Sequence, residues 1–247
     1  MDTLLHYLLA PASGMADHAI DPQIAWHGRF MFLAWGILIP LGIVSARYWK
    51  VVPGQHWPER LDNPAWWHAH RATQYGGVAL GLVGVLLAWR AAGNTDMLRN
   101  SHTTLGWIVT ALGLAQVASA LMRGSKGGPG SLTMRGDHYD MSMHRRRFEV
   151  FHKIVGYSAM LLAAATLLLG LAAADAPRWM WLLLTCWWLL LSALCVRWQR
   201  QGRAFDTYQA IWGPGAEHPG NRRRPFGFGI RRYTPQTYAS SYPRSFL

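Results

Sequence analysis

The chain has 247 residues, a formal net charge of +12 at pH 7, 51% hydrophobic residues and only two cysteines. Five long apolar runs exclude a soluble domain of this size. The cysteine count excludes a disulfide framework and a cysteine-ligated cluster, and the absence of a C-x-x-C-H motif excludes covalent c-type haem. We expect Cys186 and Cys195, both in the fifth run, to be buried apolar thiols.

The predicted elements begin with an external N-terminal segment, 1–23. Its first ten residues are apolar but lack the basic start of a signal peptide, so we expect them to lie at the membrane interface. Five runs of about 20 residues or more follow, each long enough to span a bilayer. They are residues 24–47, 65–92, 102–123, 149–174 and 177–198. The sequence thus predicts an all-α membrane helix bundle, domain 24–198, with five transmembrane helices.

Residues 199–247 form a third predicted region, a basic tail rich in Gly, Pro and Arg. It has little helical or strand periodicity, so we expect extended structure held by a surface rather than an independent domain. Its aromatic and basic stretch Arg222–Tyr233 is typical of a protein interface, which suggests a subunit of a larger complex. The alternative is a strip bound to anionic membrane lipid. Both are favoured over nucleic acid.

Lysine and arginine are distributed unevenly between the two predicted sides of the membrane. Residues 1–23 contain neither, and the other loops of that side hold Arg90, Arg99 and Arg178. The opposite side holds Arg47, Lys50, Arg60, Arg123, Lys126, Arg135, Arg145, Arg146, Arg147 and nine tail arginines from Arg197 to Arg244. The positive-inside rule therefore predicts an outside N-terminus and a cytoplasmic C-terminus, in a multi-pass protein of the inner cell membrane.

Four histidines lie near the N-terminal ends of the first four runs: His27, His70, His102 and His152. Because successive spans run in opposite directions, His27 and His102 fall near the outer face, and His70 and His152 near the cytoplasmic face. Two histidines facing each other across a bundle are typical bis-imidazole ligands of haem iron. One such histidine alone could be an interfacial residue, but four with alternating sidedness favour haem ligation.

Helix faces separate these histidines from the other seven. Small residues follow three of the four at helical spacing, for example Gly77, Gly81 and Gly84 after His70. They leave room for a porphyrin, although they also suit close helix contact without a cofactor. The face behind His68 carries larger residues, so we do not expect it to be a ligand. We expect the remaining histidines to be solvated: His6, His18, His56, His138, His144 and His218.

Around the four histidines the sequence reads HGRFMFLAWGILIPLGIVSARYWK (27–50), HRATQ (70–74), HTTLGWIVTALGLAQV (102–117) and HKIVGY (152–157). This combination resembles the cytochrome b-561 family of transmembrane electron carriers, in a bacterial-type form. The resemblance implies two b-type haems per chain, one shared by the first and third helices and one by the second and fourth. Trp67 stands where ascorbate-oxidising members have a lysine, which argues against ascorbate as the donor.

Haem propionates require cationic partners. Arg71 and Lys153 each follow a ligand directly, and Arg29 lies early inside the first span, where an arginine requires an anion. Arg47 and Arg123 are more simply explained as charges at the ends of spans. The helical rise places the two irons on the order of 20 Å apart, which permits electron tunnelling between them.

The sequence therefore predicts transmembrane electron transfer through two b-type haems, as an oxidoreductase-type subunit rather than a stand-alone catalyst. Its donor and acceptor would include a quinol or an external redox protein. Two alternatives remain: a quinol-reactive cytochrome b that anchors a larger redox complex, and a haem-free membrane scaffold.

Overall fold

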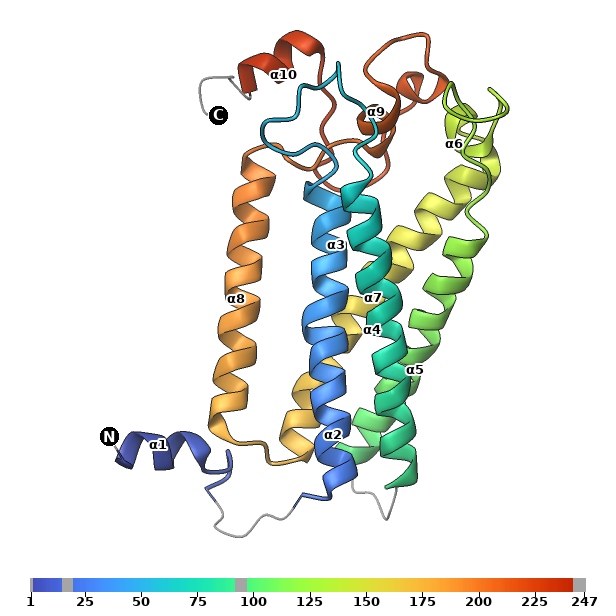
Figure 1. Cartoon of the computed structure of the whole chain (residues 1–247). Helices are drawn as coiled ribbons and strands as arrows, with labels where there is room; N and C mark the ends of the chain where they lie inside the picture. Colours follow the sequence, from blue (N-terminus) through green and yellow to red (C-terminus); the bar gives the residue numbers. More distant parts are fainter. Residues whose placement is uncertain (1, 15–19, 92–96, 242–247) are drawn as a thin grey trace. The chain divides into compact units, whose positions relative to one another are not determined.

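The computed structural model describes residues 2–14, 20–91 and 97–241, so Asp17, His18 and Arg244 lie outside the described residues. Helices and loops make up this part of the chain, and no β-strand occurs within it (Figure 1). The helices are α1 Asp2–Leu9, α2 Pro22–Met31, η1 Phe32–Leu38, α3 Ile39–Tyr48, α4 Ala65–Arg90, α5 Met97–Leu121, α6 Asp137–Asp140, α7 Met143–Ala173, α8 Arg178–Arg200, α9 Thr207–Trp212, η2 Pro219–Arg222 and α10 Pro235–Ser241. The predicted all-α fold is confirmed.

Five helical segments are long and apolar enough to cross a membrane, as predicted, and the chain is a multi-pass membrane protein. They are Pro22–Tyr48, Ala65–Arg90, Arg99–Leu121, Met143–Ala173 and Arg178–Arg200. The fourth begins six residues earlier than expected, because Ser142 caps it. The Ser142 hydroxyl accepts a hydrogen bond from the main-chain N–H of Arg145 at 3.2 Å, so the polar turn before the apolar run is already helical.

The first span changes its helical geometry in the middle. Asp21 caps its start by accepting hydrogen bonds from the N–H groups of Gln23 and Ile24, and α2 then passes into the π-helix η1. Pro40 has no N–H, so it cannot donate to the carbonyl of Gly36 four residues earlier. The indole Nε1 of Trp187, in α8, donates to that oxygen at 2.8 Å instead. The wider π turn shifts the side-chain register along the rest of the span.

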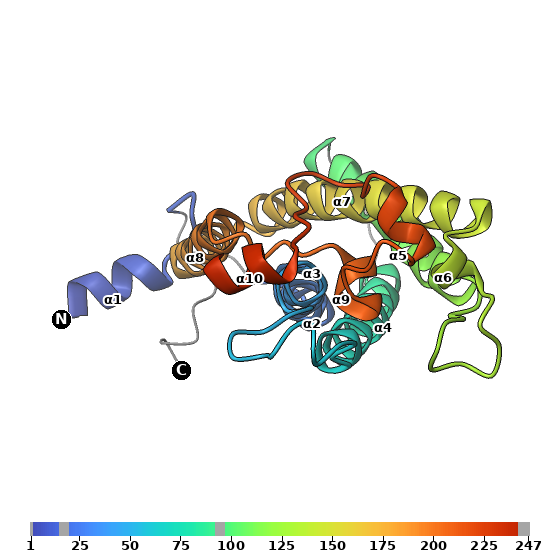
Figure 2. The same cartoon turned by 90° about the horizontal axis from the view of Figure 1, so that it is seen from above.

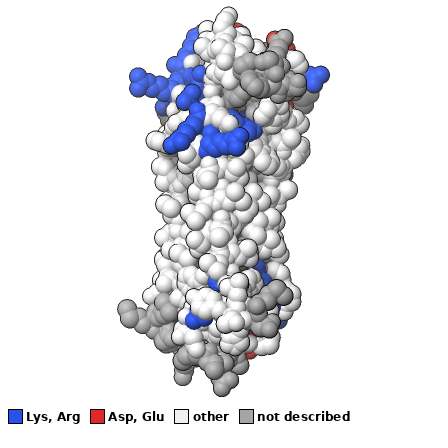
Figure 3. Space-filling view, turned by 90° about the vertical axis from the view of Figure 1, so that its left-hand side faces the viewer, with Lys and Arg blue, Asp and Glu red and all other residues white. Residues whose placement is uncertain are grey.

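The chain divides into two compact units. Unit 1 comprises Met1–Leu41, Thr73–Ala115 and Gly156–Leu194, and unit 2 comprises Gly42–Ala72, Gln116–Val155 and Cys195–Leu247. Lysine and arginine are concentrated in unit 2. Only four of the 24 belong to unit 1: Arg29, Arg90, Arg99 and Arg178. Lysine and arginine side chains gather in one patch on the face that Figure 3 draws.

The tail folds together with the loop that follows α3 (Figures 1 and 2). A buried cluster joins the two segments: Val51 and Trp57 from the loop, and Phe205, Ala210, Tyr233 and Tyr238 from the tail. Trp57 lies edge-on to Phe205 with ring centres 5.0 Å apart, and Phe205 stacks on Tyr233 at 4.9 Å. Truncating a buried aromatic side chain to alanine costs roughly 3–5 kcal/mol. The expectation of extended structure is therefore wrong for α9 and α10, which these aromatic contacts hold in place.

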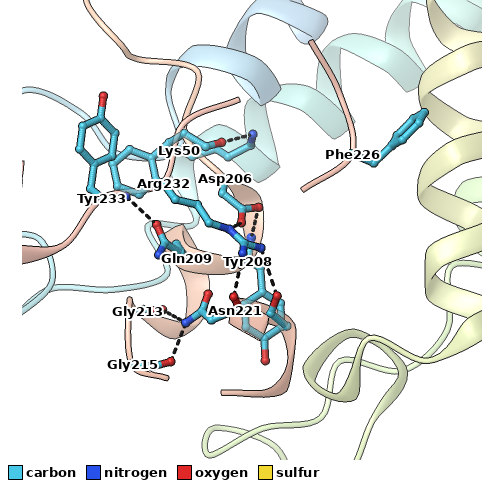
Figure 4. A network of polar contacts seen from close by, with 12 residues as sticks. Lys50, Asp206, Tyr208, Gln209, Gly213, Gly215, Asn221, Phe226, Arg232 and Tyr233 are labelled. Carbon is cyan, nitrogen blue, oxygen red and sulfur yellow. Dashed lines mark hydrogen bonds and ion pairs between the residues drawn. The ribbon is translucent and has the colours of Figure 1, made fainter. Parts of the chain in front are cut away.

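A polar network completes the tail (Figure 4). The buried carboxylate of Asp206 caps α9 by accepting from the N–H of Tyr208 and pairs with the guanidinium of Arg232. Arg232 also donates to the carbonyl oxygens of Asn221 at 2.9 Å and Gly220 at 3.1 Å. Because each charge is met by a partner, the network can be buried without an uncompensated ion.

Lys50, just beyond α3, is buried beneath the tail, and its Nζ donates to the carbonyl oxygen of Phe205 at 2.9 Å. Burial, followed by the positive charge of Lys153, lowers the pKa of Lys50 from 10.5 to about 7. Between these two values the unfolded chain holds a proton that the folded chain has lost, so the free energy of unfolding rises with pH. From pH 7 to pH 10.5, the loss of this proton raises the free energy of unfolding by on the order of 5 kcal/mol.

We therefore expect the unfolding temperature of the purified protein to rise between about pH 7 and pH 10 more steeply in the wild type than in Lys50→Met. Intrinsic tryptophan fluorescence during heating measures both. Equal pH dependence in the two proteins would show that the Lys50 ammonium is not destabilised by burial.

Candidate functional site

The first histidine pair belongs to unit 1. His27 of α2 and His102 of α5 face each other with ring centres 5.9 Å apart and ring planes at 88°. The Nδ1 atom of His27 donates to the carbonyl oxygen of Gly84 in α4 at 2.8 Å, and that of His102 donates to Thr166 O in α7 at 3.0 Å. A carbonyl oxygen can only accept, so Nδ1 carries the proton in both rings.

The second pair belongs to unit 2 and repeats this plan with different helices. His70 of α4 and His152 of α7 have ring centres 6.4 Å apart and ring planes at 75°. His70 Nδ1 donates to the carbonyl oxygen of Gly42 in α3 at 2.9 Å. His152 Nδ1 lies 3.2 Å from the hydroxyl oxygen of Ser119 in α5. Each pair thus takes two helices for its histidines and two for the oxygens that orient them.

Both pairs fit a metal ion held between two imidazoles. With metal–nitrogen distances of about 2.0–2.1 Å and a ring radius of about 1.1 Å, the two ring centres lie roughly 6.3 Å apart. The measured separations are 5.9 and 6.4 Å. With Nδ1 engaged in orienting each ring, Nε2 is the nitrogen that would ligate the metal. The donor set of two neutral imidazoles suits the two axial positions of a haem iron.

A metal held by protein side chains alone would need a larger ligand set. Structural zinc sites use four cysteine or histidine ligands, and catalytic ones use three. Within the described residues, no group of three or more His, Cys, Asp or Glu side chains could hold a metal ion. The two pairs therefore suit a cofactor that brings most of the metal's ligands with it, as a porphyrin does.

Side chains of the first span pack against most of the glycines that follow the histidines, so these glycines do not border open space. A Cβ atom at Gly81 or Gly113 would lie 3.2 Å from the indole of the buried Trp35, and one at Gly77 would lie 2.7 Å from Ile39. These glycines are therefore explained by close helix contact, which was the alternative to room for a porphyrin. Gly106, on the face of His102, differs, because no atom lies within 4 Å of such a Cβ.

Gly170 in α7 has a different role, which the sequence did not reveal. A Cβ atom at this position would lie 2.8 Å from Cε1 and 3.2 Å from Nδ1 of His102. Gly170 lies one helical turn after Thr166, whose carbonyl oxygen binds the same ring. A residue without a side chain therefore allows the imidazole to approach α7 closely enough to form that hydrogen bond.

The three predicted propionate partners have other contacts. The guanidinium of Arg29 lies 4.9 Å from the ring centre of Trp26, and that of Arg71 lies 5.7 Å from Trp67. Lys153 Nζ donates to the carbonyl oxygen of Phe226 at 2.6 Å. Arg29 and Arg71 thus lie over aromatic rings, and Lys153 binds the tail.

Trp67 brings cations close to the second pair. Its ring centre lies 6.2 Å from that of His70. The guanidinium groups of Arg71 and Arg123 lie 5.7 and 4.4 Å from the Trp67 ring, both within range of a cation–π interaction.

The tail segment 226–229 is attached to the ends of three spans in unit 2. Lys153, next to His152 in α7, binds Phe226 O; Arg47 in α3 donates to Phe228 O at 2.7 Å. Gln199 in α8 donates to Gly229 O at 2.7 Å. The tail is therefore joined to the helix that carries one histidine of the second pair.

Two expectations about other residues are wrong. His138, expected to be solvated, is buried against the rings of Tyr208 and Trp212 with ring centres 5.9 and 6.0 Å away. Burial, followed by the charge of Arg145, lowers the pKa of His138 well below 6.5. The cysteine thiols are not both buried: Cys186 is exposed and Cys195 half-buried on α8.

Comparison with known proteins found several relatives. The chain is 34% identical over 164 residues (66% of this chain, 16% of the relative) to a cytochrome b561, DM13 and DOMON domain-containing protein of Arabidopsis thaliana. It is 33% identical over 147 residues (59% and 27%) to a cytochrome b561 and DOMON domain-containing protein of the same plant. It is 28% identical over 146 residues (59% and 22%) to ferric-chelate reductase 1 of Bos taurus.

The chain therefore spans between 16% and 27% of the length of these curated relatives. No protein-family model matches the chain. No solved structure matches it significantly.

Proposed function

Because this chain belongs to the cytochrome b561 family of transmembrane electron carriers, we propose that it carries electrons through two b-type haems, one for each histidine pair. His27 and His102 ligate the first haem, and His70 and His152 the second. The single observation that supports this most strongly is the repeated geometry: two pairs of facing imidazoles, 5.9 and 6.4 Å between ring centres, with Nδ1 engaged in all four rings.

Haem iron supplies a one-electron couple when it is bound, and the protein supplies its ligands and its surroundings. The carbonyl oxygens of Gly84, Gly42 and Thr166 hold three of the imidazoles in the tautomer that presents Nε2. Phe148 stacks on His152 with ring centres 5.1 Å apart and restricts its rotation. Arg71, next to His70, is a cation that would suit an anionic propionate of this haem.

The excess of lysine and arginine in unit 2 supports the predicted cytoplasmic position of the C-terminus, in the inner cell membrane. In a chain with Cys186→Ser and Cys195→Ser, a cysteine introduced at Leu132, a fully exposed residue of unit 2, should then resist an impermeant thiol reagent in intact cells. Labelling of this cysteine in intact cells would instead indicate that the C-terminus lies outside.

The test of the proposal is haem quantification in the purified protein. We expect two haems per chain, a reduced-minus-oxidised spectrum typical of low-spin b-type haem, and complete extraction by acidified acetone, because no C-x-x-C-H motif is present to attach haem covalently. One haem per chain would contradict the two-site proposal. A colourless protein would favour the haem-free scaffold.

A further inference from the structure

One histidine of the four differs from the others in its hydrogen-bond partner. His27, His70 and His102 each donate Nδ1–H to a main-chain carbonyl oxygen, at 2.8, 2.9 and 3.0 Å. The Nδ1 atom of His152 instead meets a side chain, the hydroxyl of Ser119, at the longer distance of 3.2 Å.

The second contact of Ser119 fixes the direction of this bond. Its Oγ donates to the carbonyl oxygen of Gln116, in the same helix, at 2.9 Å. A hydroxyl has one proton and two lone pairs. With its proton committed to Gln116, Ser119 Oγ accepts the Nδ1 proton of His152. His152 is therefore in the same tautomer as the other three histidines, with a hydroxyl in place of a carbonyl as the acceptor.

We propose that Ser119 is a positioning residue that tunes the reduction potential of the haem held by His70 and His152, because its hydroxyl lowers this potential less than a main-chain carbonyl acceptor would. The inference rests on the two-haem function proposed above. A strong acceptor at Nδ1 makes an imidazole more basic, and a more basic ligand stabilises ferric over ferrous iron. A hydroxyl accepts more weakly than an amide carbonyl, and here the bond is also longer. His152 is thus the least electron-donating of the four ligands.

The two haem sites therefore differ in the hydrogen-bond acceptors of their ligands, although both use two histidines. In the first site both ligands have carbonyl acceptors, whereas in the second one has a carbonyl and the other a hydroxyl. Hydrogen bonding to the ligands therefore favours reduction of the second haem relative to the first.

The test is a redox titration of the full-length protein with Ser119→Ala, Ser119→Cys and Ser119→Thr. Loss of the acceptor in Ser119→Ala should shift the midpoint potential of the His70/His152 haem upward and leave the other potential unchanged. The thiol of Ser119→Cys is a weaker acceptor than a hydroxyl and should give a smaller upward shift. Ser119→Thr keeps the hydroxyl and should restore the wild-type value.

Thr110→Ala is the matched control. Thr110 lies in the same helix, and its hydroxyl donates to the carbonyl oxygen of Gly106 at 2.8 Å, which leaves the His152 ring untouched. Both potentials should stay at their wild-type values in this variant. Unchanged potentials in Ser119→Ala, with both haems retained, would overturn the inference. If Ser119→Ala loses the haem, Ser119→Cys is the test: an upward shift of its midpoint potential supports the inference, and an unchanged potential overturns it.

The haem content of the wild type separates this inference from the proposed function. Fewer than two haems in the wild type would refute the two-haem function itself. Two haems in the wild type, together with potentials that do not respond to Ser119, would leave that function intact and refute only the role of Ser119.

Discussion

Replacing any one of the four histidines by alanine is expected to remove one haem and leave the other. His27→Ala and His102→Ala should lose the same spectral component, and His70→Ala and His152→Ala should lose the other. The reason is geometric, since the two imidazoles of each pair face each other across about 6 Å, and a haem with one of two axial ligands is bound weakly. Haem quantification and low-temperature visible spectra of the four variants measure this.

His68→Ala is the matched control, because His68 lies two residues before His70 on the same helix but is exposed. It should keep both haems. If His27→Ala and His70→Ala removed the same component, the pairing of helices would be wrong. Loss of both haems from every variant at normal expression would point to one shared site.

A second large effect is expected from Gly170→Ala, although this variant keeps all four histidines. The new Cβ would lie 2.8 Å from His102 Cε1, closer than real contacts allow, so the ring must move and give up its hydrogen bond to Thr166. Alanine is a better helix former than glycine by about 1 kcal/mol, so α7 itself is not weakened. We expect the His27/His102 haem to be lost or to become high-spin, with the other haem unchanged.

Gly76→Ala provides the comparison for this variant. A Cβ at Gly76, in α4, would meet nothing closer than 4.0 Å, so the same substitution should retain both haems at full occupancy. Visible and electron paramagnetic resonance spectra of the two variants measure the occupancy and the spin state of each haem. A normal His27/His102 haem in Gly170→Ala would show that the imidazole has more freedom than the structure gives it.

The sequence predicted the parts of this molecule that depend on long, regular patterns. Apolar runs located the five spans, and alternating direction paired His27 with His102 and His70 with His152. In the structure the two rings of each pair face each other, although whether they ligate haem stays a prediction. Helical spacing also set His68 apart, and its side chain is exposed.

Features that depend on contacts between distant residues could not be predicted. The aromatic cluster joins Trp57 to residues more than 140 positions later, and neither segment has a helical or strand period of its own. His138 falls in a polar loop, and only the rings of Tyr208 and Trp212 bury it. Ser119 carries no signal at all, since its role depends on which side chain of α7 lies opposite its hydroxyl.

The hydrogen bonds that attach segment 226–229 to the spans use main-chain oxygen atoms of the tail. Lys153, Arg47 and Gln199 supply the donors, and carbonyl groups that every amino acid possesses supply the acceptors. These hydrogen bonds therefore tolerate replacement of the Phe228 side chain but not replacement of the three donors. Evolution can alter Phe228, which is 86% exposed, to suit a different neighbour without detaching the tail from the helices.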